Sequence, residues 1–191
     1  DRITEAARVT ATYAPRTLAS IQAELKSRKA PKPVLTLAAK GKTDYAIVLE
    51  SLPEAAQKEL ADAVKDLQRC VKLQSGAELP LAAIAAGPAI RLRLMKMQAR
   101  GLHDAYHLFT RGKDVIIEAG NADGLRNGIY GLLVDHLGCR WFQPRGLGEE
   151  IPVPKDQTVR LPALDETRGS TWFSTNGASW GAERLWDYRN R

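Results

Sequence analysis

Residues 120–145 read GNADGLRNGIYGLLVDHLGCRWFQPR, and this stretch separates two interpretations of the chain. Val115–Ala119, just before it, has the β-branched composition of a strand, and the apolar residues that follow recur at helical spacing. A strand, a glycine-rich turn and a helix in this order can bind a phosphate group. The same order also describes a helix that packs closely on a sheet and binds no ligand.

The spacing of the glycines distinguishes these two interpretations. Gly120, Gly124 and Gly128 recur every four residues, whereas dinucleotide sites use G-x-G-x-x-G and mononucleotide loops use G-x-x-x-x-G-K-S/T. No lysine follows the glycines, and Arg126 stands where the related triplet of short-chain dehydrogenases has its last glycine. We therefore expect no cofactor. Gly124, Gly128 and Gly131 are interpreted as positions of close helix–sheet approach, each costing about 1 kcal/mol of helix propensity.

The flanking sequence predicts an α/β domain. Apolar segments bounded by turn residues predict strands at 34–38, 45–50, 89–94, 105–110 and 115–119. A polar turn joins the first two segments, and the tight turn Arg111–Lys113 predicts that the last two pair as a hairpin. With two helices on one face of a mixed sheet, the chain would form a two-layer α/β sandwich.

The two predicted helices have recognisable ends. The first begins where Ser51 and Glu54 fit a capping box, and it ends at Gly76, a residue type that suits a left-handed cap. Its apolar residues recur every three or four positions, as in an amphipathic helix. The second helix is expected to use Asp123 as its N-cap and to end at Gly138.

The positive charge of the chain is concentrated near its start. The net charge is +6; residues 1–44 carry nine Lys/Arg and four Asp/Glu, and residues 45–191 carry nineteen and eighteen. A nucleic-acid surface would place Lys/Arg in a stripe with base-reading side chains, so we expect a basic arm and no nucleic-acid partner. No stretch reaches the roughly 18 apolar residues of a membrane span. No leader is visible, and because the chain begins with Asp1 we expect that an upstream segment has been removed.

Histidines and carboxylates supply candidate site residues. His103 and His107 are four residues apart, but a strand at 105–110 would separate them by about 13 Å, so we expect no metal site. His136 is expected on a helix surface. Five carboxylates are available for acid–base chemistry: Glu118, Glu149, Glu150, Asp165 and Glu166. Adjacent acidic residues in loops are usually solvated, so we expect no catalytic residue among them.

The two cysteines, Cys70 and Cys139, lack the Cys-x-x-Cys spacing and are too few to form a metal site alone. Each lies near the end of a predicted helix. A disulfide is one interpretation, if the two helices lie side by side, and a pair of buried free thiols is the other.

Aromatic residues gather near the end of the chain. They are Trp172, Phe173, Trp180, Trp186 and Tyr188, five of the twelve aromatic residues in the sequence. Such side chains stack on sugar rings in carbohydrate-binding surfaces. The alternative, which we favour, is that they belong to the core of a further domain.

Several short segments, in the right order, resemble a domain known from glycoside hydrolases. The most specific are Gly128–Gly131 (GIYG), Leu137–Pro144 (LGCRWFQP) and Gly148–Pro152 (GEEIP). They resemble the N-terminal domain that precedes the catalytic barrel in family 67 α-glucuronidases and family 20 β-N-acetylhexosaminidases. They are most similar to the same front domain in a group of large bacterial proteins. Three further segments fit the first helix, its exit and the junction with the barrel: Ala55–Leu60, Ser75–Pro80 and Pro162–Gly169.

This resemblance covers about residues 34–170, and it implies a two-layer α/β domain with a mixed sheet, similar to a zincin fold without the zinc motif. It divides the chain into a basic arm and linker at 1–33, the α/β domain at 34–162, and a linker with the start of a barrel at 163–191. In these families the catalytic carboxylates lie on the barrel. The chain is therefore expected to be a non-catalytic accessory domain whose partner is the barrel of the same parent chain.

The resemblance also implies an exported bacterial protein, periplasmic or extracellular, that acts on an oligo- or polysaccharide. Arg168 and Trp172 lie at the expected start of the first barrel strand, where they would face a sugar. The alternative function is a stand-alone carbohydrate-binding module that uses the tryptophans near the end of the chain, among them Trp172 and Trp180.

Overall fold

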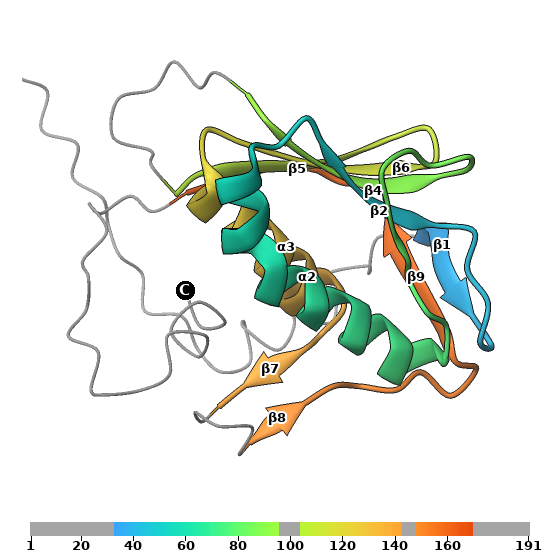
Figure 1. Cartoon of the computed structure of the whole chain (residues 1–191). Helices are drawn as coiled ribbons and strands as arrows, with labels where there is room; N and C mark the ends of the chain where they lie inside the picture. Colours follow the sequence, from blue (N-terminus) through green and yellow to red (C-terminus); the bar gives the residue numbers. More distant parts are fainter. Residues whose placement is uncertain (1–32, 96–103, 143–147, 170–191) are drawn as a thin grey trace, which may run out of the picture. The chain divides into compact units, whose positions relative to one another are not determined.

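The structure is a computed structural model that describes residues 33–95, 104–142 and 148–169 (Figure 1). His103, the aromatic residues from Trp172 onward and all but the last residue of the predicted basic arm and linker at 1–33 lie outside the described residues. The described residues belong to one compact unit that begins at Lys32. Within the described ranges, no helix has both the length and the apolar sequence needed to cross a membrane.

A six-stranded mixed sheet forms one layer of this unit. Its strand order is β10-β5-β6-β4-β2-β3, with parallel pairing among β2, β3, β4 and β6 and antiparallel pairing of β5 with β6 and β10. The strands are β2 (Ala46–Glu50), β3 (Leu81–Ala82), β4 (Ala89–Leu94), β5 (Tyr106–Arg111), β6 (Asp114–Ala119) and β10 (Asp165–Arg168). The predicted hairpin of β5 and β6 is confirmed, with Gly112 at φ 62° in the turn.

Two short pairs of strands lie outside this sheet. β1 (Pro33–Ala39) pairs antiparallel with β9 (Thr158–Pro162), and β7 (Arg140–Trp141) pairs with β8 (Glu149–Glu150). The first predicted strand therefore pairs far along the chain and not with its sequence neighbour β2. The main sheet includes β10, although β10 lies beyond residue 162, the expected end of the α/β domain. The division of the chain into domains stays a prediction.

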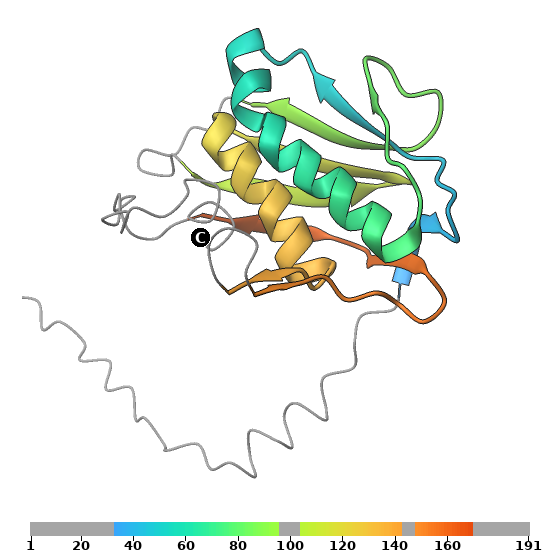
Figure 2. The same ribbon diagram turned by 60° about the horizontal axis from the view of Figure 1, so that its bottom comes forward.

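Two helices cover one face of the sheet, as Figures 1 and 2 show. They are α2 (Glu54–Ser75) and α3 (Ala122–Gly131), and α3 continues into a π-helical turn, η1 (Leu132–His136). Fully buried side chains from the helices and the sheet form the core between the layers: Leu60, Leu67, Ile90, Leu92, Ile117, Leu125 and Ile129. The two-layer α/β sandwich with a mixed sheet is thus confirmed.

The ends of the helices differ in part from the prediction. The expected capping box at α2 is wrong: the N-cap is Pro53 without a side-chain bond, and Ser51 has a left-handed φ of 52° that turns it away from the capping position. The α2 exit is confirmed, because Gly76 is left-handed at φ 77°. At α3 the cap is Asn121, whose side chain accepts from the amide of Gly124 at 2.8 Å, and not Asp123.

The glycines of α3 permit close packing, as their spacing predicted. A Cβ atom on Gly124 would lie 2.5 Å from the carbonyl oxygen of Ala105 and 2.7 Å from Cβ of Ala119. A Cβ atom on Gly128 would overlap a methyl group of Ile117, and one on Gly131 would overlap the hydroxyl of Tyr106. The helix lies on β5 and β6 at a distance that no larger residue would allow. The glycine-rich stretch is therefore a packing surface of the helix.

Candidate functional site

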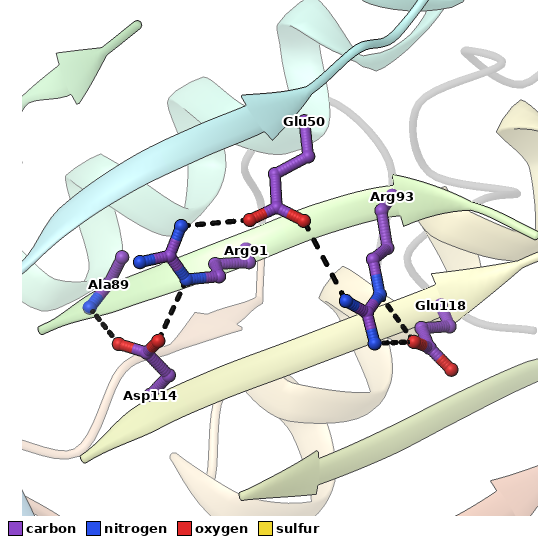
Figure 3. Close-up of polar contacts among 6 residues, drawn as sticks. All are labelled: Glu50, Ala89, Arg91, Arg93, Asp114 and Glu118. Atoms are coloured by element: carbon purple, nitrogen blue, oxygen red, sulfur yellow. Dashed lines mark hydrogen bonds and ion pairs between the residues drawn. The ribbon is translucent and has the colours of Figure 1, made fainter. Parts of the chain in front are cut away.

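A network of charged side chains covers the face of the sheet that points away from the helices (Figure 3). Ile90 and Leu92 of β4 are buried in the core, so the alternating residues Arg91 and Arg93 point to the opposite face. Carboxylates from the two neighbouring strands meet these arginines there: Glu50 on β2, and Asp114 and Glu118 on β6.

Each arginine of this network bridges strands. Arg91 donates through Nη1 to Glu50 at 2.8 Å and through Nε to Asp114 at 2.8 Å. The hydrogen bond to Asp114, and to a lesser extent the one to Glu50, raises the pKa of Arg91 above its ordinary value. Arg93 binds Glu118 closely, and its Nη1 lies 3.8 Å from Glu50. The positive charges of β4 are therefore matched by carboxylates on both sides, and the cluster acts as a cross-strand brace.

His107 extends the network to the edge of the sheet. Its Nε2 lies 2.8 Å from Asp165 on β10, and its Nδ1 lies 3.8 Å from Glu118. The ring stacks on Phe109 with centroids 4.4 Å apart. Glu118, which lies in a predicted strand, is buried in this network, while Asp165 is exposed as expected and bonded to His107. Among the described residues no three His, Cys, Asp or Glu side chains gather as metal ligands would.

A second polar cluster joins α2 to the β7–β8 pair. Trp141 and Glu149 are cross-strand neighbours, and the indole Nε1 of Trp141 donates to Glu149 at 2.6 Å. Arg69 on α2 donates to both oxygens of the same carboxylate, with Nη1 to Oε2 at 2.8 Å, and this bidentate bond raises the pKa of Arg69. The expectation of a solvated Glu149 is wrong.

Neighbouring contacts complete this second cluster. The hydroxyl of Tyr130 on α3 donates to the buried carboxylate of Asp66 at 2.9 Å, and its ring meets Trp141 edge-on with centroids 5.9 Å apart. About two helical turns further along α2, the Nε2 of Gln74 donates to the carbonyl of Leu137 at 2.7 Å. The segments that carry the family resemblance thus fold into a junction that holds α2, α3 and the β7–β8 pair together.

Arg168, the predicted sugar-binding residue, lies at the end of β10 in a third cluster. It donates to Asp135 at 2.7 Å and to Glu166 at 3.0 Å, and Glu166 also lies 2.8 Å from Nε2 of His136. Burial raises the pKa of Glu166, but the hydrogen bonds from His136 and Arg168 outweigh burial and leave that pKa below its ordinary value. His136 lies on the helical surface as predicted, but it is half-buried and bonded to Glu166, and the expectation of a freely solvated Glu166 is wrong because that half-buried carboxylate is paired twice. Trp172 lies outside the described residues.

A surface cavity of about 280 Å³ lies beside this third cluster. Its walls come from the end of α2, from η1, from the loop that precedes β9 and from β9 itself, and they include Gln74, His136, Pro152, Val153 and Arg160. Among the described residues that line it there is no aspartate or glutamate. Most glycoside hydrolases use a pair of carboxylates on either side of the bond to be cleaved, and the described residues that line this cavity supply none.

Sequence reasoning found the candidate carboxylates but missed their partners. A usable signal was the alternation in β4, where Arg91 and Arg93 alternate with apolar residues and must therefore share one face. The pairing of His136 with Glu166 had no such signal, because thirty residues separate the two positions. Cys70 and Cys139 are both buried and carry free thiols.

Comparisons with known proteins give structural likenesses only. No protein-family model matches the sequence, and no curated protein does. A GH20 exo-β-N-acetylglucosaminidase from Vibrio harveyi is 16% identical with a TM-score of 0.43, over 73% of this chain and 18% of that enzyme. A GH20 β-N-acetylhexosaminidase from Streptomyces coelicolor A3(2) is 22% identical with a TM-score of 0.43, over 72% and 24%.

A GH138 enzyme targeting pectin rhamnogalacturonan II is 18% identical with a TM-score of 0.40, over 49% of this chain and 14% of that enzyme. The chain therefore spans less than a quarter of the length of each of these enzymes. Because the identities are below 25% and the TM-scores below 0.5, the likeness assigns this chain neither a family nor an activity.

Proposed function

We propose that this chain is a non-catalytic N-terminal accessory domain of a larger carbohydrate-processing protein, and that it packs against a catalytic barrel in the same parent chain. One observation carries the proposal. The segments that resemble the front domain of glycoside hydrolases, Leu137–Pro144 and Gly148–Pro152, supply the junction residues Trp141 and Glu149, which bond to each other, and Glu149 also binds Arg69 of α2. We infer that these segments act structurally.

The state of the carboxylates supports the proposal. A glycosidase needs a general acid whose pKa is raised, with a second carboxylate about 5 to 10 Å away across the substrate. Glu118, Glu149 and Glu166 instead accept hydrogen bonds from Arg93, Arg69 and Arg168, respectively. The pKa of Glu166 is lowered, which is opposite to what a general acid requires.

An assay on the purified chain tests the proposal. We expect residues 1–191 to release no product from a panel of aryl glycosides above the rate in buffer. Three variants, Glu118→Gln, Glu149→Gln and Glu166→Gln, serve as controls for contaminating activity. Turnover that co-purifies with the chain and is abolished by one of these substitutions would show that the domain is itself a catalyst.

The parent enzyme, its export and its sugar are further parts of the proposal. The resemblance supports an exported glycoside hydrolase as the parent. In that setting Arg168 would still lie close to the barrel, although its guanidinium now holds Asp135 and Glu166. We propose that Arg168 fixes the direction in which the chain leaves the sheet, with a sugar contact from Trp172 as a further proposal.

The alternative, a stand-alone carbohydrate-binding module, makes a separate prediction. Titration with xylan or chitin oligosaccharides would then quench or shift tryptophan fluorescence in a saturable way, and Trp172→Ala or Trp180→Ala would remove the response. An accessory domain gives no saturable response to these sugars.

A further inference from the structure

Two buried thiols lie where α2 contacts the segment that follows η1. Cys70 lies in the last turns of α2, and Cys139 lies just before β7. Both side chains have no exposed surface, and both belong to the same buried core cluster. The two cysteines thus enter one region of the core from two elements that are far apart in the sequence.

Contacts on both sides hold these two elements together. On one side, Gln74 donates to the carbonyl of Leu137 at 2.7 Å. On the other side, Arg69 binds Glu149, and Glu149 accepts the indole hydrogen of Trp141. Gln74 and Arg69 lie within four residues of Cys70, and Leu137 and Trp141 lie within two residues of Cys139. Glu149 lies opposite Trp141 in the β7–β8 pair. The thiols are therefore fixed opposite each other by their neighbours.

We propose that Cys70 and Cys139 form an intramolecular disulfide when the chain meets an oxidising pool of small-molecule disulfides such as glutathione disulfide. The bond would close a loop of about 70 residues and join the end of α2 to the start of β7. This proposal stands on the burial of both thiols and on the contacts that flank them, and it is independent of the proposed accessory function.

The chemistry balances with glutathione disulfide as the oxidant. The thiolate of Cys139 attacks one sulfur of glutathione disulfide, which forms a mixed disulfide and releases one glutathione thiolate. Cys70 then loses its proton and attacks the sulfur of Cys139, which releases the second glutathione. Two thiols lose two electrons in total, and one glutathione disulfide becomes two glutathione molecules.

The surroundings favour this order of attack. The neighbouring Cys70 lowers the pKa of Cys139, even though burial opposes the charge, and Arg69 and Arg140 lower it further. The neighbouring Cys139 and burial raise the pKa of Cys70. Because both thiols are enclosed, exchange with glutathione takes place while this part of the fold is transiently open.

An equilibrium measurement on the wild-type chain tests the proposal. Residues 1–191 are incubated at graded ratios of reduced to oxidised glutathione, both folded and in concentrated urea, starting from reduced and from oxidised protein. Samples are acid-quenched and alkylated, and intact mass separates the dithiol, the mixed disulfide and the internal disulfide. Peptide mapping identifies the linked cysteines.

The expected result is a Cys70–Cys139 disulfide whose formation in the folded chain is favoured over the unfolded chain by roughly 30-fold or more, a factor typical of a stabilising disulfide. Two results would overturn the proposal. One is a folded chain that keeps both thiols at ratios that oxidise the unfolded chain, and the other is accumulation of glutathione adducts without an internal bond. Cys70→Ala and Cys139→Ala are the controls, and each should form glutathione adducts only.

Discussion

Substitution of Gly124 by alanine is expected to destabilise the domain, against the usual effect of this substitution in a helix. The new Cβ atom would lie 2.5 Å from the carbonyl oxygen of Ala105 and 2.7 Å from Cβ of Ala119. Neither neighbour can turn away, because one is backbone at the start of β5 and the other is a Cβ atom fixed to β6. To restore a separation of 3.0 Å, α3 must move by at least 0.5 Å relative to Ala105.

The expected loss follows from two opposing effects. Overpacking of this kind costs about 1–3 kcal/mol. Alanine recovers at most about 1 kcal/mol of helix propensity, and less near the first turn. We therefore expect the free energy of unfolding to fall by about 1–2 kcal/mol, which corresponds to a decrease in melting temperature of roughly 4–10 °C for a domain of this size.

Urea and thermal unfolding, followed by circular dichroism at the helical band, measure this loss. Gly87→Ala is the matched control, because Gly87 is exposed and its nearest neighbour would lie 3.2 Å from the new Cβ. The control should stay within about 0.5 kcal/mol of the wild type. If Gly124→Ala were as stable as the wild type, or more stable, the close approach of α3 to β5 and β6 would be refuted.

Four further substitutions test the caps and the polar clusters. Glu149→Ala should cost about 1–3 kcal/mol in urea unfolding, because it leaves the buried indole hydrogen of Trp141 without its acceptor, whereas Glu150→Ala on the same strand should change little. Asn121→Ala should lower the free energy of unfolding by about 1 kcal/mol, because α3 loses its N-cap. Ser51→Gly should raise the free energy of unfolding by about 0.5–1 kcal/mol, because Ser51 has a left-handed φ. A loss of stability in Ser51→Gly would instead favour the capping box. Glu166 has a lowered pKa in the folded chain, so its contribution to stability is complete above its ordinary pKa of 4.5 and is lost as pH falls through the folded value. Glu166→Gln should therefore flatten the decline in melting temperature below about pH 4.5. An unchanged acid profile would contradict the pairing of Glu166 with His136 and Arg168.

Periodicity explains why the architecture could be predicted from the sequence. The apolar residues of α2 recur at helical spacing, and Ile90 and Leu92 alternate with arginines, so both elements and their buried faces follow from local patterns. The glycines of α3 were interpretable for the same reason, because their spacing is incompatible with known phosphate loops and compatible with one helix face.

The polar contacts could not be predicted, because they depend on backbone angles and on pairs distant in sequence. Ser51 has the residue type of a cap, but its φ of 52° removes it from that role, and Asn121 takes the cap expected from Asp123. The pairing of His136 with Glu166 needs η1 and β10 to meet, which local sequence does not specify.

Dissection of the parent protein into its parts tests the central claim most directly. Glycosidase activity and melting temperature would be measured for the intact parent, for residues 1–191 alone and for the remaining segment alone. We expect all activity in the intact parent and in the remaining segment, none in residues 1–191, and a lower melting temperature for the remaining segment once this domain is removed. Activity that follows residues 1–191, or a remaining segment that contains no barrel of about 250 residues, would contradict the proposal.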